Sequence, residues 1–96
     1  MTFDDFQRSL EQDAKPQGLN AVLEALWLDA SGDWDGAHAA AQAQSDENGA
    51  WVHAYLHRKE GDLSNAGYWY RRAGRTMPDA SLADEWDSLA RFFTAD

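Results

Sequence analysis

The stretch from Gly49 to Pro78, GAWVHAYLHRKEGDLSNAGYWYRRAGRTMP, limits the possible folds of this chain more than any other. Apolar residues recur every three or four positions on both sides of Gly61-Asp62, which is the spacing of amphipathic helices. Glycine ends a helix readily because it adopts positive φ, and aspartate is a good N-cap for the next helix. Helices joined by so short a link lie antiparallel. The stretch therefore predicts a helical hairpin that ends at Met77-Pro78.

The same pair of residues occurs at Gly32-Asp33, 29 positions before Gly61-Asp62. When the two pairs are superimposed, apolar residues coincide on both sides of them. The coinciding residues are Leu23 and Val52, Trp27 and Leu56, Trp34 and Leu63, Ala37 and Ala66, and Ala41 and Tyr70. A single helical hairpin cannot bury its apolar face alone. We therefore expect two hairpins that pack together, with the first and last helices covering them.

The rest of the chain also favours helices, and no segment alternates apolar and polar residues for long enough to form a strand. Thr2 and Asn20 are candidate N-caps for the first two helices, and Asp79 or Ser81 is the candidate for the last. The sequence predicts an all-α fold, an antiparallel α-hairpin repeat of about six short helices in one compact domain. Its expected parts are an N-terminal capping helix at 1–15, a first hairpin at 19–45, a second hairpin at 49–77 and a C-terminal capping helix at 79–94.

The composition limits which classes of protein this chain can belong to. The chain has 96 residues, of which 44% are hydrophobic, and this suffices for one domain with a core. It has no cysteine and no apolar run approaching the roughly 20 residues that span a bilayer. Its first residues are acidic where a signal peptide is basic. We therefore expect a cytoplasmic protein with no membrane partner. The net charge of −9 argues against a nucleic-acid partner, because binding to phosphates needs clustered basic residues.

The basic residues are unevenly distributed along the chain. Residues 58–75 contain five arginines and lysines but only two acids, a balance of +3 on an acidic protein. A locally basic face of this kind attracts an acidic partner. The alternative is that these cations pair with acids of the same molecule. The sequence leaves both interpretations open.

The pattern Gly-Asp-aromatic-x-x-Ala at 32–37 resembles the corner of a tetratricopeptide repeat. The second unit is similar at more positions, namely Gly61, Asp62, Leu63, Ala66, Tyr70, Ala73 and Pro78. The run Tyr68–Ala73 is also similar to the end of a Sel1-like repeat. The resemblance covers residues 19–78. The chain departs from the family in its period, which is 29 residues rather than about 34, and in having two units. It also has Ala41, Gln44 and Gly49 where the family has a bulky residue, an alanine and a proline.

The resemblance implies a non-catalytic scaffold that binds a protein or peptide, without a cofactor. It also implies an inner surface formed by the first helix of each hairpin. Carried over by position, that surface consists of Leu19, Val22, Leu26, Asp29 and Ala30 from the first unit and Asn48, Trp51, Tyr55, Arg58 and Lys59 from the second. We expect Trp51 and Tyr55 to anchor a partner, and Arg58 and Lys59 to contact its acidic groups.

A second candidate for the partner site follows the same hairpin. Arg71 and Arg72 come directly after three aromatic residues, and arginine beside aromatic rings can hold an acidic peptide. Three consecutive helical residues point in three directions, so we expect Tyr70 in the core, Trp69 half-buried and Tyr68 exposed. Plain packing of the aromatic residues is the competing interpretation. Exposed aromatic residues are also consistent with a homodimer, so the chain is expected to be either a monomer or a homodimer.

The histidines are the only residues whose spacing suggests chemistry. His53 and His57 are four apart, so both rings can face the same way. They are candidate metal ligands, with His38 or Glu60 as the candidate third ligand. However, HAYLH lacks the glutamate of the HExxH zinc-protease motif, and the repeat alignment places both histidines where helices pack. Packed, hydrogen-bonded histidines are therefore the expected interpretation, and a metal-binding or metal-dependent helical enzyme domain is the alternative.

Overall fold

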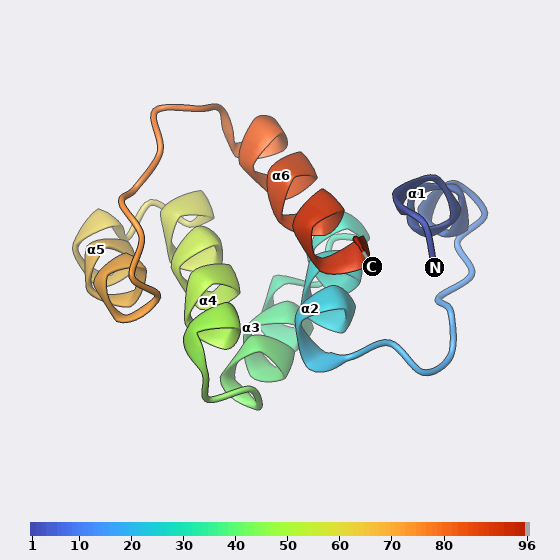
Figure 1. Ribbon diagram of the computed structural model, residues 1–96, viewed down its shortest axis with the longest axis horizontal. Helices are drawn as coiled ribbons and strands as arrows, with labels where there is room; N and C mark the ends of the chain where they lie inside the picture. The colour runs from blue at the N-terminus through green and yellow to red at the C-terminus, as the bar shows by residue number, and fades with distance from the viewer. Residues whose placement is uncertain (96) are drawn as a thin grey trace.

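The computed structural model describes residues 1–95, which form six α-helices and no strand (Figure 1). The predicted all-α fold of six short helices is therefore confirmed for this part of the chain. None of these helices has the length and apolar character needed to cross a membrane. The helices are α1 (Phe3–Glu11), α2 (Ala21–Ala30), α3 (Trp34–Gln42), α4 (Glu47–Lys59), α5 (Leu63–Arg72) and α6 (Leu82–Thr94).

Each helix begins after a residue whose side-chain oxygen accepts a hydrogen bond from the amide three positions later. These N-caps are Thr2, Asn20, Asp33, Asp46, Asp62 and Ser81. Such a cap satisfies one of the amides that a helix end leaves without a partner. Of the two candidates for the last helix, Ser81 is the cap. Helix α4 begins at Glu47, two residues before the expected Gly49, because Asp46 accepts from the Gly49 amide at 3.0 Å.

The two Gly-Asp corners have the same backbone geometry. Gly32 and Gly61 have φ of 95° and 88°, in the left-handed region that favours glycine. After each of them the aspartate amide donates back into the preceding helix, from Asp33 to the Leu28 carbonyl at 2.8 Å and from Asp62 to the His57 carbonyl at 3.0 Å. This pattern ends a helix and turns the chain sharply. As a result α2 packs against α3, and α4 packs against α5.

Helix α4 is the centre of the molecule. It contacts α2, α3, α5 and α6, and its residues from Gly49 to His57 are all buried. Helix α6 lies across α2 and α4, and α1 packs against α6 on the far side of the molecule from α5 (Figure 1). The indole Nε1 of Trp86 in α6 donates to the Leu26 carbonyl of α2 at 3.0 Å. Helix α6 thus packs on both α2 and α4.

Helix α5 lies at the edge of the molecule, beside α4 (Figure 1). Ala66 and Tyr70 are buried against the core, as expected from their spacing. Leu63 has the same helical spacing as Ala66 and Tyr70, which predicts a place on the same face, but it is 57% exposed. Leu63 is the first residue of the helix, and helical side chains tilt toward the N-terminus. Its side chain therefore extends past the end of the packed surface.

The corner glycine can be tested against a glycine inside a helix. Gly61→Ala places a Cβ on a residue at φ 88°, and we expect the free energy of unfolding to fall by about 1–2 kcal/mol. Gly67 lies within α5, and a Cβ there meets only the Arg71 side chain at 3.5 Å. Gly67→Ala should therefore raise stability, by about 0.5–1 kcal/mol. Urea denaturation of both variants measures the difference, and equal effects would contradict the corner geometry.

Candidate functional site

The inner surface expected from the repeat resemblance is buried in part: Val22, Leu26, Asp29, Trp51 and Tyr55 are buried, whereas Ala30, Asn48 and Lys59 are exposed. Trp51 and Tyr55, the expected anchors for a partner, are only 8% and 2% exposed. The Trp51 ring meets the edge of Phe92 at 5.3 Å between centroids, and the Arg75 guanidinium lies 3.4 Å above it. The contacts of both aromatic anchors are therefore made inside the molecule.

Arg58 is held by a buried carboxylate of α6. Its Nη1 donates to Glu85 Oε1 at 2.8 Å, and a second guanidinium nitrogen donates to the Ala80 carbonyl. The other carboxylate oxygen, Oε2, accepts from the Tyr70 hydroxyl at 2.5 Å. The hydrogen bond to Glu85 raises the pKa of Arg58, and burial raises the pKa of Tyr70. One carboxylate therefore joins α4, α5 and α6.

Lys59 and Tyr55 are held in the same way by α2. The buried carboxylate of Asp29 accepts from Lys59 Nζ at 2.8 Å and from the Tyr55 hydroxyl at 3.0 Å. Burial, followed by the charge of Asp29, raises the pKa of Tyr55. A surface hollow of about 690 Å³ lies beside this group and is lined in part by Trp86. Within residues 1–95 the one cation that lines it, Lys59, is already paired with Asp29, so this hollow holds no unpaired cation.

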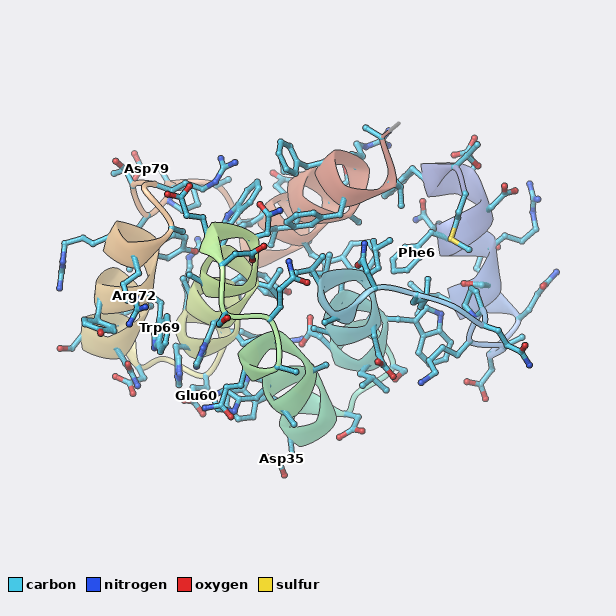
Figure 2. The ribbon with its side chains drawn as sticks, turned by 60° about the horizontal axis from the view of Figure 1, so that its bottom comes forward. Phe6, Asp35, Glu60, Trp69, Arg72 and Asp79 are labelled. Carbon is cyan, nitrogen blue, oxygen red and sulfur yellow. The ribbon has the colours of Figure 1, made fainter. Side chains whose placement is uncertain are left out.

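The exposed aromatic and basic residues of α5 are arranged as their positions predict. Tyr70 is buried, Trp69 is half-buried and Tyr68 is 45% exposed. The Arg72 guanidinium lies 5.3 Å from the Trp69 ring centre and donates to the Tyr68 hydroxyl at 3.2 Å. Arg71 is exposed beside it. Figure 2 shows Trp69 and Arg72 side by side on α5. We call Tyr68, Trp69, Arg71 and Arg72 the α5 face.

The α5 face adjoins a hollow of about 590 Å³. Trp69 and Arg72 form one wall of this hollow, and the loop before α4, including Ser45 and Asp46, forms another. His53 of α4 also reaches it. A groove of this size accommodates a few side chains of a bound peptide.

All three histidines meet where α3 packs against α4. The ring centres of His38 and His53 are 4.5 Å apart, those of His53 and His57 are 4.8 Å apart, and those of His38 and His57 are 5.2 Å apart. His57 Nδ1 lies 3.0 Å from Glu60 Oε1. Of the two candidate third ligands, His38 joins the cluster itself, and Glu60 is the hydrogen-bond partner of His57.

Two tryptophans enclose this cluster. The Trp34 ring stacks on His38 at 5.0 Å, and the Trp69 ring stacks on His53 at 4.0 Å. Residue spacing does not place these two tryptophans at the cluster. Their place follows from the crossing of helices, which residue spacing within one helix does not encode. The sequence does indicate that α4 is central. Nine consecutive residues from Gly49 to His57 contain no acid, lysine or arginine, as expected for a helix buried on all sides.

Burial keeps two of the histidines neutral. Desolvation, together with the charges of His38 and His57, lowers the pKa of His53 to about 4. Desolvation and the charge of His57 lower the pKa of His38 as well. At neutral pH both rings are therefore imidazoles with a free lone pair, the form that accepts hydrogen bonds and binds metal ions.

The carboxylate shared by three helices should be important for stability. Glu85→Ala leaves Arg58 and Tyr70 without their acceptor, and we expect the free energy of unfolding to fall by about 3–5 kcal/mol. Asp87→Ala on the same helix removes the same charge from an exposed pair with Arg91, and should change stability by less than about 1 kcal/mol. Urea denaturation compares the two, and similar losses would contradict a special role for Glu85.

The low pKa of His53 predicts a loss of stability in mild acid. An unfolded histidine titrates near 6.5, so the unfolded chain binds the proton first as pH falls below that value. Stability is complete above about pH 6.5, and declines until His53 also titrates near 4. We expect a loss of about 1 kcal/mol between pH 7 and 5.5. His53→Phe should lose less over that range, as measured by urea denaturation at the two pH values; an unchanged dependence would contradict the assignment.

Neither a protein-family model, nor a curated protein, nor a solved structure matches this chain. The resemblance to tetratricopeptide repeats therefore rests on the sequence pattern alone. Two groups of side chains are the candidate functional sites, the α5 face and the histidine cluster.

Proposed function

We propose that this chain is a non-catalytic helical module that binds an acidic segment of a protein or peptide partner on the α5 face. The observation that carries the proposal is how the cations are distributed. Of the eight lysines and arginines, five form ion pairs within residues 1–95, and the remaining three are Arg71, Arg72 and Arg75. All three lie in the last turn of α5 or just after it.

The surrounding sequence makes this distribution informative. Residues 63–78 contain these three arginines and no acid, on a chain that has 17 acids in total. The Arg75 guanidinium lies over the largely buried Trp51 ring. Arg71 and Arg72 are exposed on the α5 face and form no ion pair within residues 1–95. A carboxylate from another molecule fits this need, because guanidinium groups bind carboxylates through paired hydrogen bonds.

The chemistry of the face favours a peptide over a nucleic acid. The net charge of −9 repels a long polyphosphate, whereas a short acidic segment needs to approach only one basic edge. The negative charge of the remaining surface also directs such a segment to α5, which gives orientation. Tyr68 and Trp69 add apolar contact area with few rotatable bonds, a combination typical of binding surfaces.

The repeat resemblance supports the same class of function. The two helix pairs α2–α3 and α4–α5 have matching corners, and in our proposal they are two related tetratricopeptide-like units. Helix α6 covers the first helices of both pairs. The surface left for a partner is then the second helix of the last pair, together with the hollow between Trp69 and the loop before α4.

Selection of peptides from a random displayed library tests the proposal. The wild-type protein should enrich peptides rich in aspartate and glutamate. Arg71→Gln/Arg72→Gln should weaken their binding at least about 10-fold, because a hydrogen bond to a charged group contributes roughly 1.5–3 kcal/mol. Affinity is measured by fluorescence anisotropy with a selected peptide, and circular dichroism checks that the variant is folded.

A matched control uses arginines elsewhere on the surface. Arg8→Gln/Arg91→Gln removes the same two charges from exposed ion pairs on α1 and α6. It should leave peptide binding within about twofold at moderate salt, since charges beyond a Debye length are screened. Selected peptides without an excess of acids, or an equal loss in both double variants, would overturn the proposal.

A further inference from the structure

Every histidine of the chain lies in one cluster. The sequence contains three, and His38, His53 and His57 each contribute a ring nitrogen to a group in which no two atoms are more than 4.8 Å apart. They come from two helices, so their meeting depends on how α3 packs on α4. Packing alone does not require three imidazoles at one place, because apolar side chains fill a helix–helix contact without polar nitrogens.

We propose that His38, His53 and His57 form a binding site for Zn²⁺ or a similar divalent transition-metal ion. Zinc–nitrogen bonds of about 2.0–2.1 Å place tetrahedral ligand nitrogens roughly 3.3 Å apart. The three nitrogens lie within 4.8 Å, so modest side-chain rotation brings them to that separation. A water molecule takes the fourth position, as in other sites with three histidines.

The hydrogen bond between His57 and Glu60 prepares one ligand. A carboxylate only accepts hydrogen bonds, so Nδ1 of His57 carries the proton and donates to Glu60 Oε1 at 3.0 Å. Nε2 is then left with its lone pair. A metal-binding histidine almost always donates its other ring N–H to an acceptor of this kind, which orients the ring and increases its basicity. The contact with Glu60 therefore gives His57 the arrangement that such ligands have.

The environment of the cluster also suits a bound ion. Burial lowers the pKa of His53 and of His38, so these nitrogens bind a metal near neutral pH without first losing a proton. Trp34 and Trp69 form an apolar wall that limits access of water. His38 is half-buried and His53 borders the hollow of about 590 Å³, so an ion can reach the cluster from solvent.

The composition of the chain makes a clean test possible. There is no cysteine and no fourth histidine, so a site built from histidine or cysteine ligands can lie only here. The experiment uses the chain with its affinity tag removed, because a histidine tag binds the same metals. Zn²⁺ is titrated by isothermal calorimetry. Co²⁺ is titrated in parallel, because its visible absorption reports tetrahedral coordination. Its quenching of the tryptophan fluorescence reports an ion bound near the two tryptophans that stack on the cluster, Trp34 and Trp69.

We expect one Zn²⁺ per chain and a tetrahedral Co²⁺ spectrum. His38→Gln changes a half-buried ligand and should weaken binding at least about 100-fold. Glu60→Gln keeps an oxygen that accepts from His57 Nδ1 but removes the negative charge of the carboxylate. This variant should bind Zn²⁺ about 10–100-fold more weakly. Glu60 is 40% exposed at its side chain, so this variant remains informative if a histidine variant fails to fold.

Two surface acids provide the control. Asp4→Asn/Asp5→Asn removes exposed carboxylates from α1 and should leave Zn²⁺ affinity unchanged. Two results would overturn the proposal. One is that the wild type binds Zn²⁺ without a defined stoichiometry. The other is that the Glu60→Gln variant and the His38→Gln variant both bind Zn²⁺ with wild-type affinity. We expect Arg71→Gln/Arg72→Gln to bind Zn²⁺ with wild-type affinity. The metal site is therefore tested separately from the peptide-binding function.

Discussion

Two buried carboxylates determine how the helices of this protein are arranged. Glu85 of α6 accepts from Arg58 of α4 and Tyr70 of α5, and Asp29 of α2 accepts from Lys59 and Tyr55 of α4. A buried charge is tolerated only when it is paired and its oxygens are satisfied. Asp29 meets this condition through two residues of the central helix, and Glu85 meets it through one residue of α4 and one of α5. Packing of α2 on α4 satisfies Asp29, and contact of α6 with α4 and α5 satisfies Glu85. These two pairings also decide which cations remain for other purposes.

Local rules predict much of the fold from the sequence. Aspartate, asparagine, serine and threonine at the expected N-caps, and glycine at the two corners, define the six helices to within a few residues. These signals act over one turn of the chain. In α6, Trp86, Leu89 and Phe93 recur at helical spacing, which shows that this helix has an apolar face but does not show which helices it covers. Glu85 likewise has the sequence context of a surface acid in a first helical turn, although it is buried.

In the candidate sites, too, local features could be predicted from the sequence and long-range contacts could not. The directions of Tyr68, Trp69 and Tyr70 follow from the helical repeat and could be predicted. The pairing of Arg58 with an acid 27 positions later could not, since it depends on long-range packing. The histidine pair on α4 could be recognised from its spacing. The arrival of His38 from α3 depends on the crossing of two helices, which single-sequence periodicity does not describe.

The position of α6 also has a consequence for the order of folding. Contacts within each helix pair join residues close in the chain, whereas the Trp86 indole meets the Leu26 carbonyl across 60 positions. Local contacts form early because little chain entropy is lost in closing a short loop. The two pairs can therefore assemble first, with Trp51 and Tyr55 exposed in an open apolar groove. Docking of α6 closes that groove, so during synthesis the chain is most prone to aggregation just before its last helix becomes available.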